Sequence, residues 1–442
     1  MKQTAYSSYK PTGADWLEKV PSHWDMKRLR FAAQINPLAS ELRCPPDTLV
    51  SFVPMEAVGE YGGLALDQEK PLDEIGSGYT YFREGDVVVA KITPCFENGK
   101  GALARGLTNG IAFGTTELHV LRSRENIDPG FLFYLTVSDA FRDMGEAHMY
   151  GAGGQKRVPE LFIKDLRCPL PPKEEQRAIA RFLDTKVAQI DGLIKRRAGL
   201  VPILIEKRRA LITRSVTKGV NTRVPVRATK IPYLPSVPAH WRTDTPLKYL
   251  LSTVGGSTPS TGDARYWVEG DIPWVSPKDM HVTEIHSSED CVTQEALTET
   301  ALKLIDPGAV LIVVRGMILA HSFPVAITRV PVTVNQDMKA LIPCRRLQPE
   351  YLAYLLRGLS SYLLSLVETS AHGTKAFRTD VWSRLILPEP PIEEQLEIVS
   401  VLDRETAAID DQIDAINRHV SALQEYRAAV ITAAVTGKIK VV

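Results

Sequence analysis

Two long segments of the chain carry apolar residues at the seven-residue spacing of helices that pack along one another. The first segment repeats Ile190, Ile194, Val201, Leu204 and Leu211, preceded by Val187 and interrupted by Arg197 and Arg208. The second repeats Ile409, Ile413, Ile416, Val420, Leu423 and Val430, preceded by Thr406 and interrupted by Arg427. Alternating steps of three and four residues are typical of a coiled-coil seam. The pattern therefore predicts two long helices.

Both predicted helices have the same start and stop signals. PPKEEQ (171–176) opens the first and PPIEEQ (390–395) opens the second, and glycine follows each end, at Gly219 and Gly437. Proline suits a first helical turn, glutamate suits the positive end of the helix dipole, and glycine is a frequent stop. A helix of about 44 residues would be roughly 65 Å long. Pro202 lies inside the first helix and is expected to kink or interrupt it near Val201, whereas the second copy has Ser421.

The repeat extends over the whole chain at a spacing near 219 residues. WLEKVPSHW (16–24) returns as YLPSVPAHW (233–241), and IDPGFLFYL (127–135) returns as LQPEYLAYL (347–355). Solenoid and propeller repeats are much shorter, so this is a tandem duplication of a domain and its trailing helix. We expect a first domain at 1–168, a helix at 169–220, a second domain at 221–387 and a helix at 388–442.

The two domains have mixed patterns. Short β-branched runs, DVVVAKI (86–92), AVLIVV (309–314) and VPVTV (330–334), lie among glycine and proline turns. One helical element per copy is expected, at 129–144 and 349–367. The fold class is therefore α+β, two globular domains joined by two long helices, and Trp24 and Trp241 are expected to be packing anchors.

Composition and charge narrow the function. The 442 residues carry a net charge of +1, and the five cysteines lie far apart without a metal-binding spacing, which favours a reducing cytoplasmic location. No signal-like or membrane-spanning run is found. Residues 170–220 hold 12 Lys+Arg against 5 Asp+Glu, and residues 389–442 hold 5 against 10. This difference favours packing of the two helices on each other.

Catalytic motifs are absent from the sequence. It has no G-x-x-x-x-G-K-[ST] loop for ATP and no NPPY-like element of an adenine methyltransferase. DTK (184–186) has the letters of a nuclease site but lies in the predicted helix, and His281 and His286 have no further ligands nearby. We expect no catalytic residues, no metal site and no cofactor in this chain.

The order of these elements resembles the specificity subunit of Type I restriction-modification systems. Two PP-x-E-E-Q helix starts, two VP-x-HW domain starts, and VNQDMKAL followed by TKAF carry the resemblance over nearly the whole chain. It implies that each domain reads one half of a split double-stranded DNA target. It also implies that the helices form an antiparallel coiled coil, with a pseudo-two-fold repeat, that fixes the separation of the halves.

The resemblance further implies partners. Two modification subunits would use S-adenosylmethionine to methylate adenine, and restriction subunits would use ATP and Mg to translocate and cut DNA. Because the two domains differ far more than the helices, we expect an asymmetric target with two unlike halves. A duplicated coiled-coil scaffold that organises other proteins without reading DNA is the alternative.

Basic and polar residues in glycine-rich loops are the candidate DNA contacts, because such side chains reach phosphates and base edges. In the first domain they are Lys91, Thr93, Asn98, Lys100, Gln155, Lys156 and Arg157. In the second they are Ser257, Thr258, Ser260, Thr261, Arg265, Arg315, His372, Thr374, Lys375 and Arg378. Loop 151–157 is expected to correspond to loop 370–378, and Arg315 to Lys91, while Trp267 and Trp274 are expected in the core. Neither domain is strongly basic, with 19 basic against 22 acidic residues in 1–169 and 17 against 15 in 221–388. The chain alone should therefore bind DNA weakly.

Overall fold

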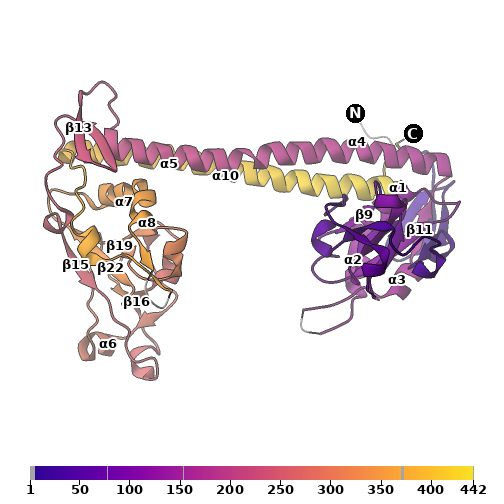
Figure 1. The fold of residues 1–442 in the computed structure, drawn as a ribbon, viewed down its shortest axis with the longest axis horizontal. Helices are drawn as coiled ribbons and strands as arrows, with labels where there is room; N and C mark the ends of the chain where they lie inside the picture. Colours follow the sequence, from indigo (N-terminus) through magenta and orange to yellow (C-terminus); the bar gives the residue numbers. More distant parts are fainter. Residues whose placement is uncertain (1–4, 77, 153, 370–372, 442) are drawn as a thin grey trace. The chain divides into compact units, whose positions relative to one another are not determined.

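The structure, a computed structural model, describes residues 5–76, 78–152, 154–369 and 373–441. Internal contacts group the chain into two compact units, residues 1–198 with 417–442 and residues 199–416. Each unit contains one globular domain and segments of both long helices (Figure 1). A helix segment from the other copy of the repeat thus belongs to each unit.

Unit 1 holds two four-stranded sheets and two two-stranded pairs. In order across each sheet, the strands are β6 (Glu69–Pro71), β5 (Leu49–Val53), β10 (Ile111–Gly114) and β7 (Thr80–Arg83), then β4 (Ala33–Ile35), β11 (Leu118–Ser123), β8 (Val87–Ala90) and β9 (Gly101–Leu103). The pairs are β1 (Tyr9–Ala14) with β2 (Leu17–Pro21), and β12 (Arg167–Leu170) with β3 (Asp25–Arg28). All four residues of β8 are buried, which explains the uninterrupted apolar run predicted as a strand.

The helices of this domain are α1 (Pro129–Thr136), α2 (Asp139–Ala147) and α3 (Glu160–Asp165). The sequence predicted one helix over 129–144, but the structure has two. The Ser138 side chain accepts a hydrogen bond from the Phe141 N–H and caps a new helix there. Helix α1 packs against α4 (Lys173–Ala198), so the globular domain and the long helix share one core.

Unit 2 repeats the plan with a larger sheet. Its strands are β15 (Leu251–Gly255), β22 (Met338–Pro343), β19 (Val310–Val313), β20 (Val325–Thr328) and β17 (Glu284–Ile285), beside a smaller sheet of β18 (Cys291–Val292), β16 (Ile272–Val275) and β21 (Thr333–Val334). Two further pairs are β13 (Val226–Ile231) with β14 (Leu234–Pro238), and β23 (Glu368–Thr369) with β24 (Lys375–Ala376). The helices are α5 (Leu200–Lys218), α6 (Gln294–Glu299), α7 (Pro349–Gly358), α8 (Ser360–Ser365) and α9 (Thr379–Trp382). The predicted strands at 309–314 and 330–334 are confirmed by β19 and β21.

The two long helices differ as the proline predicts. Helix α10 runs unbroken from Ile392 to Val435. The first copy is divided into α4 and α5 at Gly199, whose φ of −64° and ψ of −15° remain in the helical region. Pro202 has no N–H to donate to the carbonyl of Ala198, four residues earlier, so the break falls there rather than at Val201. The predicted interruption is confirmed, and the break at Gly199 lies two residues before Val201.

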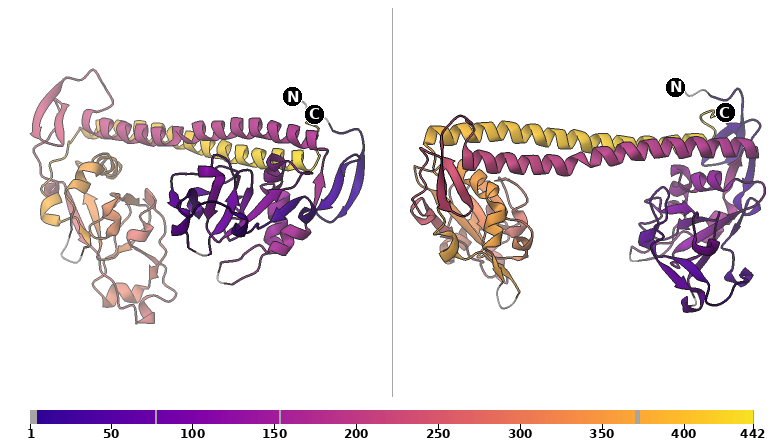
Figure 2. Two further views of the ribbon diagram at one scale, coloured as in Figure 1. Left: turned by 45° about the vertical axis from the view of Figure 1, so that its right-hand side comes forward. Right: turned by 45° about the horizontal axis from the view of Figure 1, so that its top comes forward.

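Inside each unit, two long helix segments lie side by side in every view (Figure 2). In unit 1, Arg427 of α10 donates to Asp191 of α4 at 2.5 Å, and in unit 2, Arg208 of α5 forms an ion pair with Asp410 of α10 at 3.3 Å. These pairs occupy repeat-equivalent positions. Two of the arginines that interrupt the predicted seams therefore face a carboxylate on the neighbouring helix.

The predicted seam positions are the covered ones on these helices, apart from Arg197. Ile190, Ile409 and Val430 are buried, and Ile194, Val201, Leu204, Leu211, Ile413, Ile416, Val420 and Leu423 are partly buried. Arg197 is exposed, two residues before the helix break. The heptad pattern thus identified the packed face correctly on both sides of the break.

The duplicated PP-x-E-E-Q motif holds each helix to its domain. Its second glutamate, Glu175, accepts from the indole N–H of Trp24 at 3.2 Å and contacts the His23 ring nitrogen at 2.8 Å. Glu394 makes the same two contacts with Trp241 (2.9 Å) and His240 (2.7 Å). Both tryptophans are buried, which confirms that they are packing anchors.

The glutamine of the motif completes this attachment. Gln176 is fully buried; its Oε1 accepts from the Asp128 N–H at 2.7 Å, and its Nε2 donates to the carbonyls of Pro171 (2.7 Å) and Asn126 (3.1 Å). Gln395 repeats all three bonds with its own neighbours. Each glutamine satisfies backbone groups just before an equivalent helix, α1 in the first domain and α7 in the second, which explains why the motif occurs twice.

Candidate nucleic-acid interface

Two of the loops selected from the sequence meet in the first domain. The Thr93 N–H donates to the Lys156 carbonyl at 3.0 Å, and the Val158 N–H donates to the Lys91 carbonyl at 2.8 Å. Tyr150 and Arg157 close the base of the second loop with two backbone hydrogen bonds of 3.2 and 2.8 Å. We call residues 91–101 and 151–157 the first loop pair. The ribbon between α2 and α3 extends away from the body of the domain at this place (Figure 1).

The second domain repeats the same frame. The Gly316 N–H donates to the Lys375 carbonyl at 3.0 Å, and the Phe377 N–H donates to the Val314 carbonyl at 2.8 Å. We call residues 314–316 and 373–378 the second loop pair. Loop 151–157 is thus equivalent to the loop before Phe377, as the sequence predicted, and Lys156 corresponds to Lys375. The candidate His372 lies outside the described residues.

The predicted match between Arg315 and Lys91 is wrong by one position. The bridge Arg315–Ala376 corresponds to the bridge Ile92–Arg157, so Arg315 is equivalent to Ile92. Val314 takes the place of Lys91, because each donates its N–H to the residue before β22 or β11. Counting from the end of an apolar run could not fix this register, since neighbouring residues of a strand face opposite sides.

The side chains of the first loop pair divide into exposed and anchored groups. Asn98, Gln155 and Lys156 are exposed. Lys100 donates to the Met55 carbonyl at 3.1 Å, which attaches its loop to the domain. Thr93 Oγ1 donates to the Lys156 carbonyl at 3.3 Å, so Thr93 connects the two loops.

Arg157 is held by an acidic residue that sequence reasoning missed. Its guanidinium forms a two-fold contact with the Glu117 carboxylate at 2.8 and 2.9 Å. The hydrogen bond from Arg157 lowers the pKa of Glu117 from its ordinary value. Glu117 precedes β11 and lies 40 residues from Arg157 in sequence, so no local pattern indicated the pair. The guanidinium of Arg157 is already bound to Glu117, so Gln155 and Lys156 are the side chains of this loop that remain available to contact DNA.

The second loop pair presents different chemistry. Lys375 donates to Thr369 Oγ1 at 2.8 Å, and Arg378 pairs with Asp380 at 2.8 Å and Glu368 at 3.4 Å. Thr374 is half-buried. Arg315 is exposed and forms no ion pair with the residues that the structure describes. Among the basic residues described in this loop pair, Arg315 is therefore the one most available to contact a phosphate.

The remaining candidates lie between β15 and β16 of the second domain. Ser260, Thr261 and Arg265 are exposed, Thr258 donates to Gln336, and Arg265 pairs with Asp263 at 2.8 Å. The Ser257 hydroxyl is buried and has no hydrogen-bond partner among the described residues.

Two tryptophans hold this segment in place. Trp267 and Trp274 donate to the carbonyls of Ser260 and Ser257, each at 3.0 Å, and their rings meet edge to face at 5.1 Å. Trp274 is buried in a small apolar cluster, which confirms the prediction that it is a core residue. Trp267 packs against this cluster but is only partly buried, so the prediction is wrong for Trp267.

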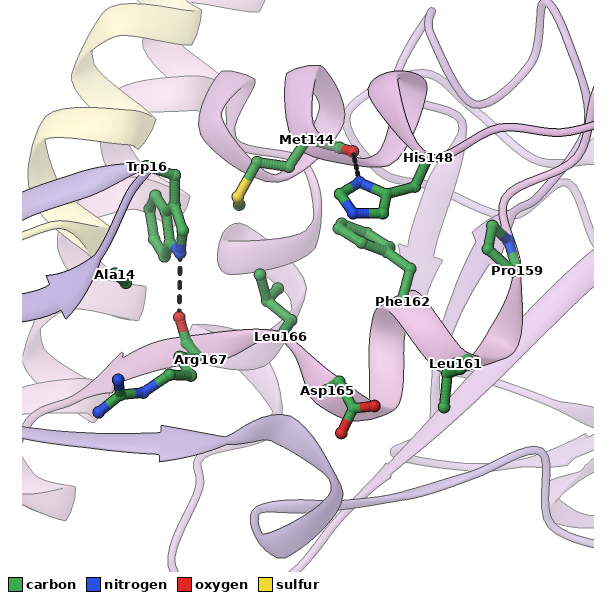
Figure 3. Close-up of a pocket in the computed structure, with 10 residues that line it drawn as sticks. All are labelled: Ala14, Trp16, Met144, His148, Pro159, Leu161, Phe162, Asp165, Leu166 and Arg167. Carbon is green, nitrogen blue, oxygen red and sulfur yellow. Dashed lines mark hydrogen bonds between the residues drawn. The ribbon is translucent and has the colours of Figure 1, made fainter.

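An apolar pocket of about 440 Å³ lies on another part of the first domain, lined by Trp16, Met144, Phe162 and Leu166 among others (Figure 3). The Trp16 indole donates to the Arg167 carbonyl at 3.1 Å across one side. None of the candidate DNA contacts lines this pocket. In the second domain the counterpart of Trp16, Tyr233, is covered by the ring of Tyr362 at 4.0 Å. The pocket is not part of the interface.

The described residues contain neither a group of metal ligands nor a helix that could span a membrane. In the ranges that the structure covers, no three His, Cys, Asp or Glu side chains are grouped to hold a metal ion. No helix there is both long and apolar enough to cross a bilayer. Asp184 of the DTK string accepts a hydrogen bond from the Tyr134 hydroxyl at 2.8 Å, which is a structural contact between α4 and α1.

Known proteins similar to this chain share its sequence features and fold. The family model described as Type I restriction modification DNA specificity domain matches residues 78–198 and 246–418. The specificity subunit of the Type I restriction enzyme EcoAI of Escherichia coli is 40% identical over 167 residues, which are 37% of this chain and 28% of that protein. The EcoR124I/EcoR124II specificity subunit of Escherichia coli is 34% identical over 171 residues, 39% of this chain and 42% of that protein. The chain thus spans less than half of these curated relatives.

A longer match covers most of the chain, and two solved structures cover nearly all of it. The putative Type I restriction enzyme MjaX specificity subunit of Methanocaldococcus jannaschii is 24% identical over 365 residues, 81% of this chain and 79% of that protein. The HsdS subunit from Thermoanaerobacter tengcongensis superimposes with a TM-score of 0.57 at 22% identity over 95% of this chain and 98% of its own. A chain from a study of complex assembly and conformational transition of the type I R-M system gives 0.72 at 22% identity, over 95% and 99%. These likenesses show the fold, and the family model matches more than half of the sequence. The chain belongs to the family of Type I restriction modification DNA specificity proteins.

Proposed function

We propose that this chain supplies DNA sequence specificity to a Type I restriction-modification complex and has no catalytic residues of its own. The observation that carries the proposal is the repeated loop frame. Three backbone contacts recur in both domains, while the side chains at the loop tips differ. Two domains that read different half-sites would need the same loop backbone with different side chains at the loop tips. The target is then split and asymmetric.

The chemistry of the tips fits this role. Amide and ammonium groups such as those of Gln155 and Lys156 reach base edges and phosphates, and the neighbouring ion pair of Arg157 with Glu117 holds their loop in position. In the second domain Arg315 and the exposed residues of 257–265 take the corresponding part. Both domains have near-zero net charge, so much of the phosphate contact would come from partner subunits.

The partners follow from the family. Two modification subunits would dock on the exposed faces of the long helices and carry S-adenosylmethionine for adenine methylation. Restriction subunits would carry ATP and Mg for translocation and cleavage. The two helix pairs would form one antiparallel coiled coil that fixes the spacing of the half-sites. Dimeric DNA readers place half-sites about 34 Å apart, and a rigid helical spacer can set such a distance.

Binding by single-residue variants tests the reading of DNA. The complex of this chain with its modification subunits would be titrated with DNA duplexes. One duplex carries the split target sequence that the complex methylates, and the others carry single base substitutions in one of its half-sites. Gln155→Ala should reduce discrimination at one half-site only, by about 5- to 150-fold if a two-fold hydrogen bond is lost. Gln189→Ala, an exposed glutamine on α4, is the matched control.

Two outcomes would contradict the proposal. Equal binding of all duplexes by the unaltered complex would favour the scaffold. An equal loss at both half-sites with Gln155→Ala would show that the first domain does not read a separate half.

A further inference from the structure

A cationic cavity lies in unit 2 where the long helices meet the second domain. Its volume is about 510 Å³, within the range of ligand-binding pockets. Residues from α5, α7, α8, the first half of α10 and the segment after Arg315 contribute to its walls. The polar and charged ones are Arg208, Arg209, His321, Ser322, Arg357, Ser360 and Asp410.

Positive charge exceeds negative charge in this cavity. Arg208 pairs with Asp410 at 3.3 Å, the one carboxylate among the lining residues. Arg209 is exposed and forms no ion pair with any residue in the described ranges. Arg357 donates only to backbone carbonyls, those of Val325 (2.9 Å) and Thr283 (3.0 Å). Because arginine stays protonated at any physiological pH, Arg209 and Arg357 bring two positive charges to the cavity, and neither forms an ion pair with a described residue.

The surroundings of Arg357 disfavour the charged form of its side chain. Burial lowers the pKa of Arg357 below its ordinary value. The nearby charge of Arg208 acts in the same direction, and Tyr354, Glu284 and Asp403 act against it. The Nε atom of Arg208 is buried without a hydrogen-bond partner in the part of the chain that the structure describes, as is the Nε atom of its repeat equivalent Arg427, so this feature is common to both units. An anion in the cavity would offset the cost of burying the Arg357 charge.

Unit 1 provides an internal comparison at the equivalent helix position. There Arg427 pairs with Asp191, and the ring of Tyr61 covers its guanidinium at 4.0 Å. The Arg427 side chain is 12% exposed, whereas that of Arg208 is 37% exposed. The counterpart of Arg209 in the repeat is Ala428. Unit 1 therefore neutralises and covers its arginine, and unit 2 leaves an open surplus of charge.

We propose that this cavity binds a phosphate group, and that the phosphate belongs to the DNA backbone next to the half-site read by the second domain. The guanidinium fork matches phosphate oxygens better than any other side chain does. One short segment connects the cavity to the second loop pair: Arg315 and Gly316 lie in the loop pair, and His321 lines the cavity. Phe323 of the same wall packs on Phe377, which belongs to the second loop pair. This inference rests on the proposed DNA reading and adds a phosphate contact that only one half of the protein makes.

Arg209→Gln in the assembled complex tests the contact. Arg209 lies at the surface, so its substitution leaves the helix packing intact. Arg214→Gln removes the same charge from an exposed position of the same helix, about 140° around it and outside the cavity. The affinity for duplex DNA would be measured over a series of salt concentrations. Arg209→Gln should weaken binding equally for all sequences and reduce the slope of log affinity against log salt by about 1, and Arg214→Gln should change neither.

Other outcomes identify other ligands or overturn the inference. If the salt slope is unchanged but inorganic phosphate raises the melting temperature of the native chain more than that of Arg209→Gln, the phosphate comes from a small molecule. If Arg209→Gln instead loses its modification subunits at unchanged salt slope, the cavity takes an acidic protein group and the inference is wrong. Identical behaviour of the two variants overturns it as well. Failure of the native complex to bind DNA at all would overturn the proposed function together with it.

Discussion

Replacing Gln176 by methionine should open unit 1 without disturbing unit 2. The variant keeps the side-chain volume, so the cavity term is small, but removes three hydrogen bonds of a fully buried group. The Asp128 N–H loses its acceptor, and the carbonyls of Pro171 and Asn126 each lose a donor. A buried unsatisfied donor costs about 1–3 kcal/mol and each lost bond about 1 kcal/mol, so we expect a loss of about 3 kcal/mol in total.

Hydrogen exchange with mass spectrometry on the full chain is the suitable assay, because a chain of two units need not unfold in one step. A loss of this size should speed exchange of the slowest amides of α1 and β12 on the order of 100-fold, and leave those of unit 2 unchanged. Gln189→Met, at an exposed position of α4, is the control. If Gln176→Met exchanged no faster than this control, the motif would not hold helix and domain together.

Three further predictions concern single groups. Arg157 lowers the pKa of Glu117, so this ion pair stabilises the first loop pair at pH values above the ordinary glutamate pKa. The stabilisation is lost as the pH falls through the lowered pKa. Glu117→Gln should therefore flatten the acid side of a plot of melting temperature against pH. Burial raises the pKa of the Cys168 thiol to about 12, so Cys168 should react with a thiol reagent only after unfolding, as mass spectrometry of labelled peptides would show. Gly437 has a φ of +71°, and a Cβ there would lie 2.4 Å from Pro21 Cδ; Gly437→Ala should cost unit 1 about 2 kcal/mol in urea unfolding.

Periodic features of the fold could be predicted from the sequence. The seams, the proline interruption, the buried strands and the tryptophan anchors all depend on local spacing, which burial imposes directly on the chain. The duplication added a second test of each assignment. The correspondence of the two late loops was predicted for the same reason.

Contacts between distant residues could not be predicted in this way. No sequence pattern near Arg157 indicates its ion pair with Glu117, and none near Arg427 indicates its contact with the Tyr61 ring. The match of Arg315 failed because the register of a strand depends on its partners in the sheet. The split of the helix at Ser138 depends on one capping hydroxyl, which a periodic apolar pattern hides.

The central claim is that each domain reads its own half of an asymmetric DNA target. Methylation-sensitive sequencing of a host that expresses this chain with its modification subunit tests it most directly. We expect a new split adenine motif with two unlike halves, and exchange of residues 1–168 for those of a relative should change one half only. A palindromic motif, or no added methylation although both subunits are well expressed, would contradict it.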